Sequence, residues 1–163
     1  MALVTLQSSD GVAYSVQKEI AVLSSLVHDV ITHCPEEGDA VVPLPKVPSR
    51  ALGPIVEWMR RKKQSSTQQG TAVAVESECR TRLSDLSNWE RVFFNDLSKD
   101  VLFLVLNAAN YMGIAGLVAV GSSFIAEMIS GMTLSEARDF LNIPLDHDSD
   151  AGHILEKYPW ISI

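Results

Sequence analysis

The sequence predicts an α/β fold in which a small N-terminal sheet is followed by helices. The first residues alternate apolar with small or polar side chains around a turn, which is typical of a β-hairpin. From Ser49 onward, apolar residues recur at the 3.6-residue period of an amphipathic helix. The apolar run Leu97–Ile129 then has the length of two packed helices.

Three strands are expected in the sheet. Ala2–Gln7 is rich in β-forming residues, Ser8–Gly11 has turn chemistry, and Val12–Val16 alternates apolar with small or polar residues, so these residues predict the hairpin. Val41–Pro45 is a short extended segment, and its prolines suit only the edge or end of a sheet because proline cannot donate to a strand ladder. We expect this segment to pair with the hairpin.

The pattern predicts three helices in the first half of the chain. A short helix covers Gln17–Leu23, and a second follows the possible caps Ser24 and Ser25 and stops before Pro35. A third opens at Pro48-Ser49 and ends in the basic run Arg60–Lys63, since cations suit a helix C-terminus. The apolar stripes of the second and third helices are Leu26, Val27, Val30 and Ile31, and Leu52, Ile55, Val56 and Met59.

Residues 64–82 differ in composition from the rest of the chain. They are rich in Ser, Thr and Gln and contain few large apolar side chains and no sustained period. Such a segment buries too little apolar area to offset the entropy of ordering it. We predict a mobile loop inserted between two halves.

A helix that starts near Ser84-Asp85 is expected before the apolar run.

The apolar run Leu97–Ile129 has no charged residue from Val101 to Ala126, so it must be tested as a membrane span, which needs about 20 apolar residues. Asn and Ser side chains interrupt it, Gly113 stands where a helix would end, and no Lys/Arg cluster flanks it. We therefore predict two buried helices that turn at Tyr111–Gly113, and no membrane span.

The C-terminal residues also predict helices. Thr133 and Glu136 have the spacing of a capping box, in which both side chains satisfy backbone amides at a helix start. That helix is expected to run to about Leu141 before Pro144 breaks it. A last short helix fits residues 148–157.

Charge and cysteine content restrict the class of protein. A net charge of -7 over 163 residues disfavours binding to nucleic acid or anionic membranes, which need a basic footprint. Proteins or small molecules are the expected partners. The only cysteines, Cys34 and Cys79, lie far apart and follow no signal-peptide pattern, so we expect reduced thiols and a cytoplasmic and nuclear protein.

The sequence contains no recognisable motif for metal binding, phosphate binding or catalysis. His28, His33 and Cys34 match no zinc spacing, and Asp146–Asp150 imitates the start of an EF-hand loop but has its glycine and glutamate in the wrong register. The sequence also contains no glycine-rich phosphate loop and no Gly-x-Ser-x-Gly elbow. We expect a protein that is not an enzyme, with no catalytic residue, no metal site and no cofactor.

Several short motifs, in order along the chain, resemble the Skp family, the S-phase kinase-associated adaptors of SCF ubiquitin ligases. The resemblance extends from the first residue to Trp160, with the loop at 64–82 unmatched. That loop is neutral and rich in Ser and Gln, whereas the family usually has an acidic one. The motifs are Leu6–Gly11 (LQSSDG), Glu19-Ile20-Ala21, Pro43–Pro45 (PLP), Ala108–Tyr111 (AANY) and Gly116-Leu117.

The resemblance implies a BTB/POZ fold over residues 1–129 and a C-terminal helical extension over residues 130–163 that serves dimerisation or F-box binding. Asn110 and Tyr111 fall on the Asn-Tyr pair with which the family contacts a cullin. A second set falls on the family's F-box-facing surface. Its members are Phe103, Val118, Ser122, Ile125, Phe140, Ile143 and Trp160.

A purely structural interpretation competes with this assignment. Phe103, Val118 and Ile125 would be core residues in any helical protein. Asn110 is less easily explained in this way, because a buried amide needs several hydrogen bonds. The segment Pro144–Pro159 is also one residue shorter than in the family, which puts its grip on an F-box in question.

We therefore expect an adaptor that joins F-box proteins to a cullin scaffold, and through the cullin to the RING subunit and the E2. Without a partner the open apolar helices are expected to self-associate. An elongin C-like adaptor and a BTB oligomerisation module outside SCF complexes are the alternatives. The proteins that copurify with the chain distinguish these three.

Overall fold

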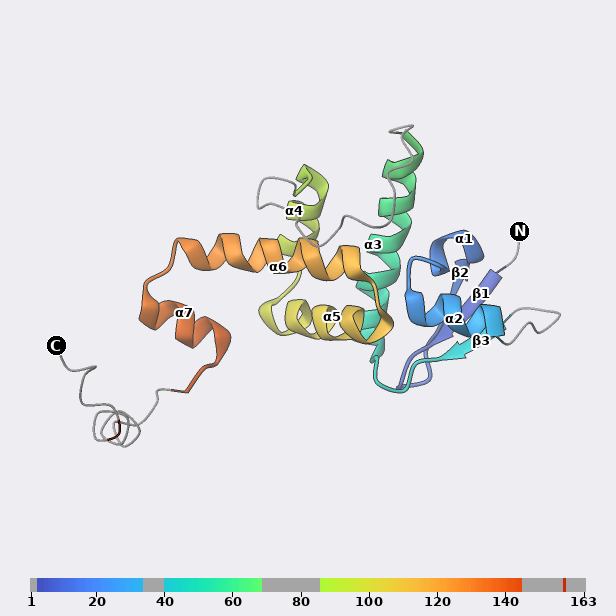
Figure 1. Cartoon of the computed structure of the whole chain (residues 1–163), viewed down its shortest axis with the longest axis horizontal. Coiled ribbons are helices and arrows are strands. Elements are labelled where there is room, and N and C mark those ends of the chain that lie inside the picture. Colours follow the sequence, from blue (N-terminus) through green and yellow to red (C-terminus); the bar gives the residue numbers. More distant parts are fainter. Residues whose placement is uncertain (1–2, 34–39, 69–85, 145–156, 158–163) are drawn as a thin grey trace. The chain divides into compact units, whose positions relative to one another are not determined.

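The structure is a computed structural model that describes residues 3–33, 40–68, 86–144 and 157. In these residues a three-stranded sheet precedes a series of helices, which confirms the predicted fold class (Figure 1). The chain divides into two units, Met1–Ala126 and Glu127–Ile163. The strands are β1 (Leu3–Gln7), β2 (Ala13–Gln17) and β3 (Ala40–Pro43), and the helices are α1 (Lys18–Ala21), α2 (Ser25–His33), α3 (Ser49–Gln68), α4 (Asn88–Asn95), α5 (Lys99–Met112), α6 (Ala115–Ser130) and α7 (Leu134–Leu141).

The sheet has the strand order β2-β1-β3. β1 and β2 form the predicted antiparallel hairpin, in which Val4 pairs with Val16. β3 runs parallel to β1 at the edge of the sheet, where Pro43 is tolerated, and this confirms the predicted pairing. Alternate residues of the strands are buried on one face: Val4, Leu6, Val16 and Val42.

The hairpin turn is tied to the start of α3 by Asp10. Its Oδ1 accepts a hydrogen bond from the Ser49 amide at 2.9 Å, and its Oδ2 accepts one from the Ser49 hydroxyl. These bonds, the Ser49 hydroxyl bond foremost and a Ser8 hydroxyl bond second, lower the pKa of Asp10 to about 2. The carboxylate therefore acts as a cap for α3 from 39 residues away in the sequence.

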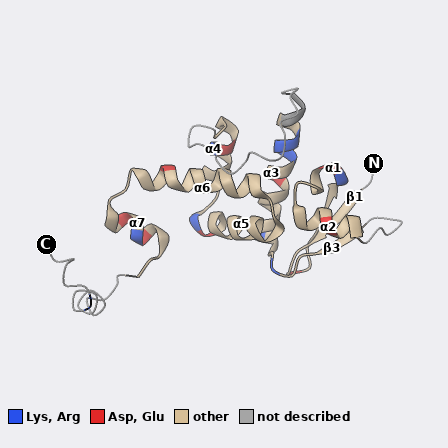
Figure 2. Cartoon of the chain, viewed as in Figure 1, with Lys and Arg blue, Asp and Glu red and all other residues tan. Residues whose placement is uncertain are grey.

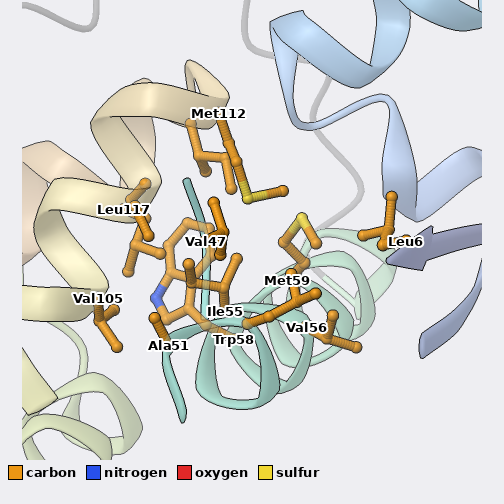
Figure 3. Close-up of a cluster of buried hydrophobic side chains, with 14 of the residues drawn as sticks. Leu6, Val47, Ala51, Ile55, Val56, Trp58, Met59, Val105, Met112 and Leu117 are labelled. Atoms are coloured by element: carbon orange, nitrogen blue, oxygen red, sulfur yellow. The ribbon is translucent and has the colours of Figure 1, made fainter. Parts of the chain in front are cut away.

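One face of α3 forms the centre of the first unit's core. Its stripe packs against α5 on one side and reaches the sheet on the other (Figure 3). Close packing of this kind makes each large side chain worth about 2–5 kcal/mol against truncation to alanine. The buried members of the stripe are Ala51, Leu52, Ile55, Val56, Trp58 and Met59.

The predicted end of α3 was wrong. The helix does not stop at the basic run but continues to Gln68, so residues 64–68 are helical and not loop. The basic side chains make contacts within this longer helix and beyond it: Arg61 pairs with Glu57 at 2.6 Å, Lys62 with Glu90 at 3.3 Å, and Arg60 donates to the Ser15 carbonyl at 3.0 Å. The rest of the predicted loop, residues 69–82, lies outside the described residues.

α4 begins with a capping box that the sequence analysis missed. Ser87 is its N-cap, and the Glu90 carboxylate accepts hydrogen bonds from the Ser87 amide at 3.1 Å and hydroxyl at 2.5 Å. Glu90 is almost fully buried, and its charge is compensated by Lys62. The predicted start at Ser84-Asp85 lies outside the described residues.

The apolar run forms two helices, α5 and α6, which turn at Gly113 as predicted. Gly113 has φ +67°, the left-handed conformation that ends many helices. Helices α5 and α6 touch where Gly121 faces Leu106, so a β-carbon at this position would displace the Leu106 side chain. Among the described residues, none of the helices combines the length and apolar character needed to cross a bilayer.

The second unit contains α7. Thr133 is its N-cap, and Glu136 accepts a hydrogen bond from the Thr133 amide at 2.8 Å, which confirms the predicted capping box. These bonds lower the pKa of Glu136. α7 ends at Leu141 as predicted, before Asn142 in the left-handed conformation. The last predicted helix, 148–157, lies outside the described residues except for Lys157.

Gly113→Ala should destabilise the first unit by about 2 kcal/mol, because a left-handed alanine costs about 1–2 kcal/mol and the added β-carbon would also displace the Ser25 hydroxyl and crowd the Ser25 Cβ at 3.2 Å. Gly11→Ala is the matched control, since Gly11 also has positive φ but open space around it, and should cost about 1 kcal/mol. Urea denaturation measures both. Equal effects of the two substitutions would mean that the Ser25 contact does not constrain the turn.

Asp10→Asn should change how stability depends on pH. A carboxyl whose pKa falls from 3.8 to about 2 on folding contributes stability above pH 4 that is lost as the pH drops through 2. The variant should therefore be less stable than the wild type at pH 6, and the difference should vanish near pH 2. Thermal melts along this range test it, with Ser49→Ala expected to weaken the same dependence. A difference that stays constant with pH would contradict the assignment.

Candidate protein-interaction surfaces

Asn110 and Tyr111 lie in the last turn of α5, the position predicted from the sequence. The Asn110 side chain is exposed, whereas the Tyr111 ring is half-buried and packs against the core. The turn below them is held to the start of α2 by two long-range bonds. The Ser24 hydroxyl donates to the Met112 carbonyl at 2.5 Å, and the Ser25 amide donates to the Gly113 carbonyl at 3.4 Å. The end of α5 is thus tied to α2 and forms a platform that presents the amide of Asn110 and the ring of Tyr111.

Lys46 is a neighbour of this platform that the sequence analysis did not identify. It lies in the connection between β3 and α3, and its Nζ stands 5.7 Å from the centroid of the Tyr111 ring. Lys46 and Tyr111 are far apart in the sequence, and no local motif predicts their contact. Only the packing of the β3–α3 connection against the end of α5 could reveal it.

Val118, Ser122 and Ile125 lie on one face of α6, because residues three and four apart share a face. Ser122 is exposed, and Val118 and Ile125 are half-buried against the core. The adjoining face of the helix is fully committed to the core. Its buried residues are Leu117, Val120, Gly121 and Phe124.

Phe103 belongs to α5 and is half-buried. It shares a stripe of that helix with Asn107 and Asn110, at spacings of four and three residues. Seven residues of helix separate Phe103 from Asn110 by about 10 Å along the axis. The two sets of predicted residues therefore meet on α5 without overlapping.

The remaining predicted residues belong to the second unit. Phe140 is half-buried in α7, and Ile143, just beyond the helix, is 50% exposed. Leu134 and Leu141 of the same short helix are also exposed, and α7 has no buried residue. Trp160 lies outside the described residues. A joint surface of these residues with α6 stays a prediction.

Comparison with known proteins places the chain in a family. The family model described as "Skp1 family, tetramerisation domain" matches residues 2–64. The "SCF ubiquitin ligase complex protein SKP1b" of Dictyostelium discoideum is 34% identical over 157 residues, which cover 96% of this chain and 93% of that protein. The chain belongs to the Skp1 family.

Fungal relatives of this Skp1-family chain are similar over nearly the same length. The "E3 ubiquitin ligase complex SCF subunit sconC" of Arthroderma otae is 30% identical over 143 residues, which cover 88% of this chain and 84% of that protein. The protein of the same name from Talaromyces marneffei is 32% identical, with 88% and 86% covered. The match to the family's POZ model and the three-stranded sheet confirm the predicted BTB/POZ-like fold. The individual contact residues stay predictions.

Charge is distributed unevenly in this Skp1-family chain. Figure 2 shows α5 and α6 without charged side chains along nearly all of their length, whereas basic residues gather on α3. A cavity of about 410 Å³ lies beside that basic segment, between β2, α1 and α3, and none of the predicted contact residues lines it. In the part of the chain that the structure describes, no group of three His, Cys, Asp or Glu residues is placed to hold a metal ion.

Proposed function

We propose that the chain is an adaptor subunit of an SCF-type ubiquitin ligase, where it joins a cullin scaffold to F-box substrate receptors. The observation that carries this proposal is one face of α6 that folding leaves partly accessible: Ser122 is exposed, and Val118 and Ile125 are half-buried. The chain that presents this face is similar to its relatives over most of its length. Those relatives are named as SCF complex subunits. Adaptor function requires such a face to remain available after the chain has folded.

The F-box contact is proposed to form mainly by apolar burial. Val118 and Ile125 are already half-buried, so a covering F-box helix contributes on the order of 1 kcal/mol from each when it removes them from water. The lack of charge from Val101 to Ala126 favours such a contact, because no ion has to be desolvated. Phe140, Ile143 and Trp160 are proposed to close over the same F-box.

The cullin contact is proposed to be smaller and more polar. Asn110 offers an exposed amide, and Tyr111 offers the edge of a ring anchored in the core. Tyr residues held in this way serve often as interface anchors, since little side-chain entropy is lost on binding. In this proposal the ligase chemistry belongs to the RING subunit and the E2, and the chain works in the cytoplasm and the nucleus.

Asn110→Lys and Ser122→Lys should separate the two surfaces. Both residues are exposed on helices, so the same charge is added without disturbing the core. Asn110→Lys should weaken cullin binding about thirtyfold or more, because an unpaired charge in a desolvated contact costs about 2–5 kcal/mol. F-box affinity should change by less than about 0.5 kcal/mol. Ser122→Lys should show the reverse pattern.

Calorimetry of the full chain with each partner measures these affinities, and circular dichroism confirms that both variants fold. Loss of both partners from a folded variant would contradict the separation. Copurification of elongin-type box proteins, or of the chain only with itself, would instead support one of the two alternative functions.

The chain alone should self-associate through the α6 face of Val118, Ser122 and Ile125. An F-box peptide that covers this face should convert the chain into one defined complex. The peptide should also raise the free energy of unfolding by about 2.7 kcal/mol at a concentration one hundred times its Kd. Light scattering and thermal melts provide the two measurements. A monodisperse monomer at high concentration that no F-box stabilises would remove the adaptor proposal.

A further inference from the structure

Lys46 is held beside the proposed cullin contact by its surroundings. The connection that carries it is fixed by two bonds to the hairpin: the Leu44 amide donates to the Gln7 carbonyl at 2.7 Å, and the Ser9 amide donates to the Val47 carbonyl at 2.8 Å. Leu44 and Val47 are both buried. The backbone at Lys46 is therefore positioned by the core, while its own side chain is exposed.

The ammonium group of Lys46 has spare capacity for a partner. Its recorded contact is with the Tyr111 ring at 5.7 Å, and among the described residues it forms no ion pair. A cation near the face of a half-buried ring gains only a weak attraction, and an ammonium has three donors to offer. The negative C-terminal end of α5 also favours a cation here. The group is thus pre-positioned without being neutralised.

We infer that Lys46 forms one contact surface with Asn110 and Tyr111 and receives a carboxylate side chain of the cullin that covers them. This inference rests on the proposed adaptor function. It adds the requirement that the cullin presents a negative charge here. A partner that covers the Tyr111 ring also removes water from the Lys46 ammonium, which then needs a carboxylate to pair with.

The charge requirement makes Lys46 a determinant of specificity. A scaffold that presents a carboxylate pairs with the ammonium, whereas a scaffold with an apolar or basic residue there leaves a desolvated charge unpaired. The chain has a net charge of -7 and therefore repels an acidic partner surface. The Lys46 cation reduces this repulsion locally. The chain therefore selects among cullin scaffolds by their charge at this point.

The test measures affinity of the full chain for the cullin that copurifies with it. Lys46→Gln should weaken binding about fivefold and Lys46→Glu about thirtyfold or more, while Lys46→Arg should stay within about threefold of the wild type. The differences should shrink in 0.5 M salt, about ten times the ionic strength of a low-salt buffer, since exposed charge pairs are screened. Arg50→Gln is the matched control, because it removes an exposed cation from α3 and should change nothing.

Melting temperature and F-box affinity are measured on the same variants. Both should remain at the wild-type value, which a purely structural role of Lys46 would not allow. Cullin binding that is unchanged in Lys46→Glu overturns the inference and leaves the adaptor function standing. Joint loss of cullin binding, F-box binding and stability also overturns it. A wild-type chain with which no cullin copurifies overturns the proposed function itself.

Discussion

Burial of one face of α3 joins the sheet to the helices that carry both proposed contacts. Trp58 and Met59 lie near the middle of this helix and are almost inaccessible to solvent. α3 packs against α5 and contacts β2 and α1, so this helix connects both layers of the first unit. Because a close-packed interior transmits displacement, the position of the α5 platform depends on the packing of α3.

The second constraint is the tight connection between α5 and α6. A β-carbon at Gly113 would displace the Ser25 hydroxyl, and one at Gly121 would displace the end of the Leu106 side chain. The first close approach brings the α5–α6 turn against α2, and the second brings α6 against α5. Gly121 belongs to the stripe of α6 that is buried in the core, whereas Val118 and Ile125 on the neighbouring stripe are half-buried.

The two proposed contacts use different physics on adjacent parts of one scaffold. The α6 stripe of Val118, Ser122 and Ile125 contains no charged residue and suits a partner helix that brings apolar area. The α5 platform combines an amide, a ring and, in our inference, the Lys46 cation, which suits a partner that brings a carboxylate. An adaptor benefits from this difference, because the F-box does not suit the α5 platform and the cullin does not suit the α6 stripe.

Much of the fold could be predicted from the sequence because its signals are local. The alternation in β1 and β2, the edge prolines of β3, the glycine turn after α5 and the Thr133–Glu136 box each depend on residues within a few positions of one another. The end of α3 was wrongly predicted because the basic run looks like a C-terminal signal in isolation. The partners of this basic run, Ser15 and Glu90, are 45 and 28 residues away, so no local signal indicates that the run lies inside a helix.

The sequence by itself determined the order and type of the elements, the break at Gly113 and, through resemblance, the family and the candidate residues Asn110 and Tyr111. Only the tertiary structure decided that Asp10 caps α3, that Ser24 holds the end of α5 from 88 residues away, and that Lys46 stands over the Tyr111 ring. The reason is physical. Backbone preferences and periodicity act between near neighbours, whereas such contacts exist only after packing has brought distant segments together.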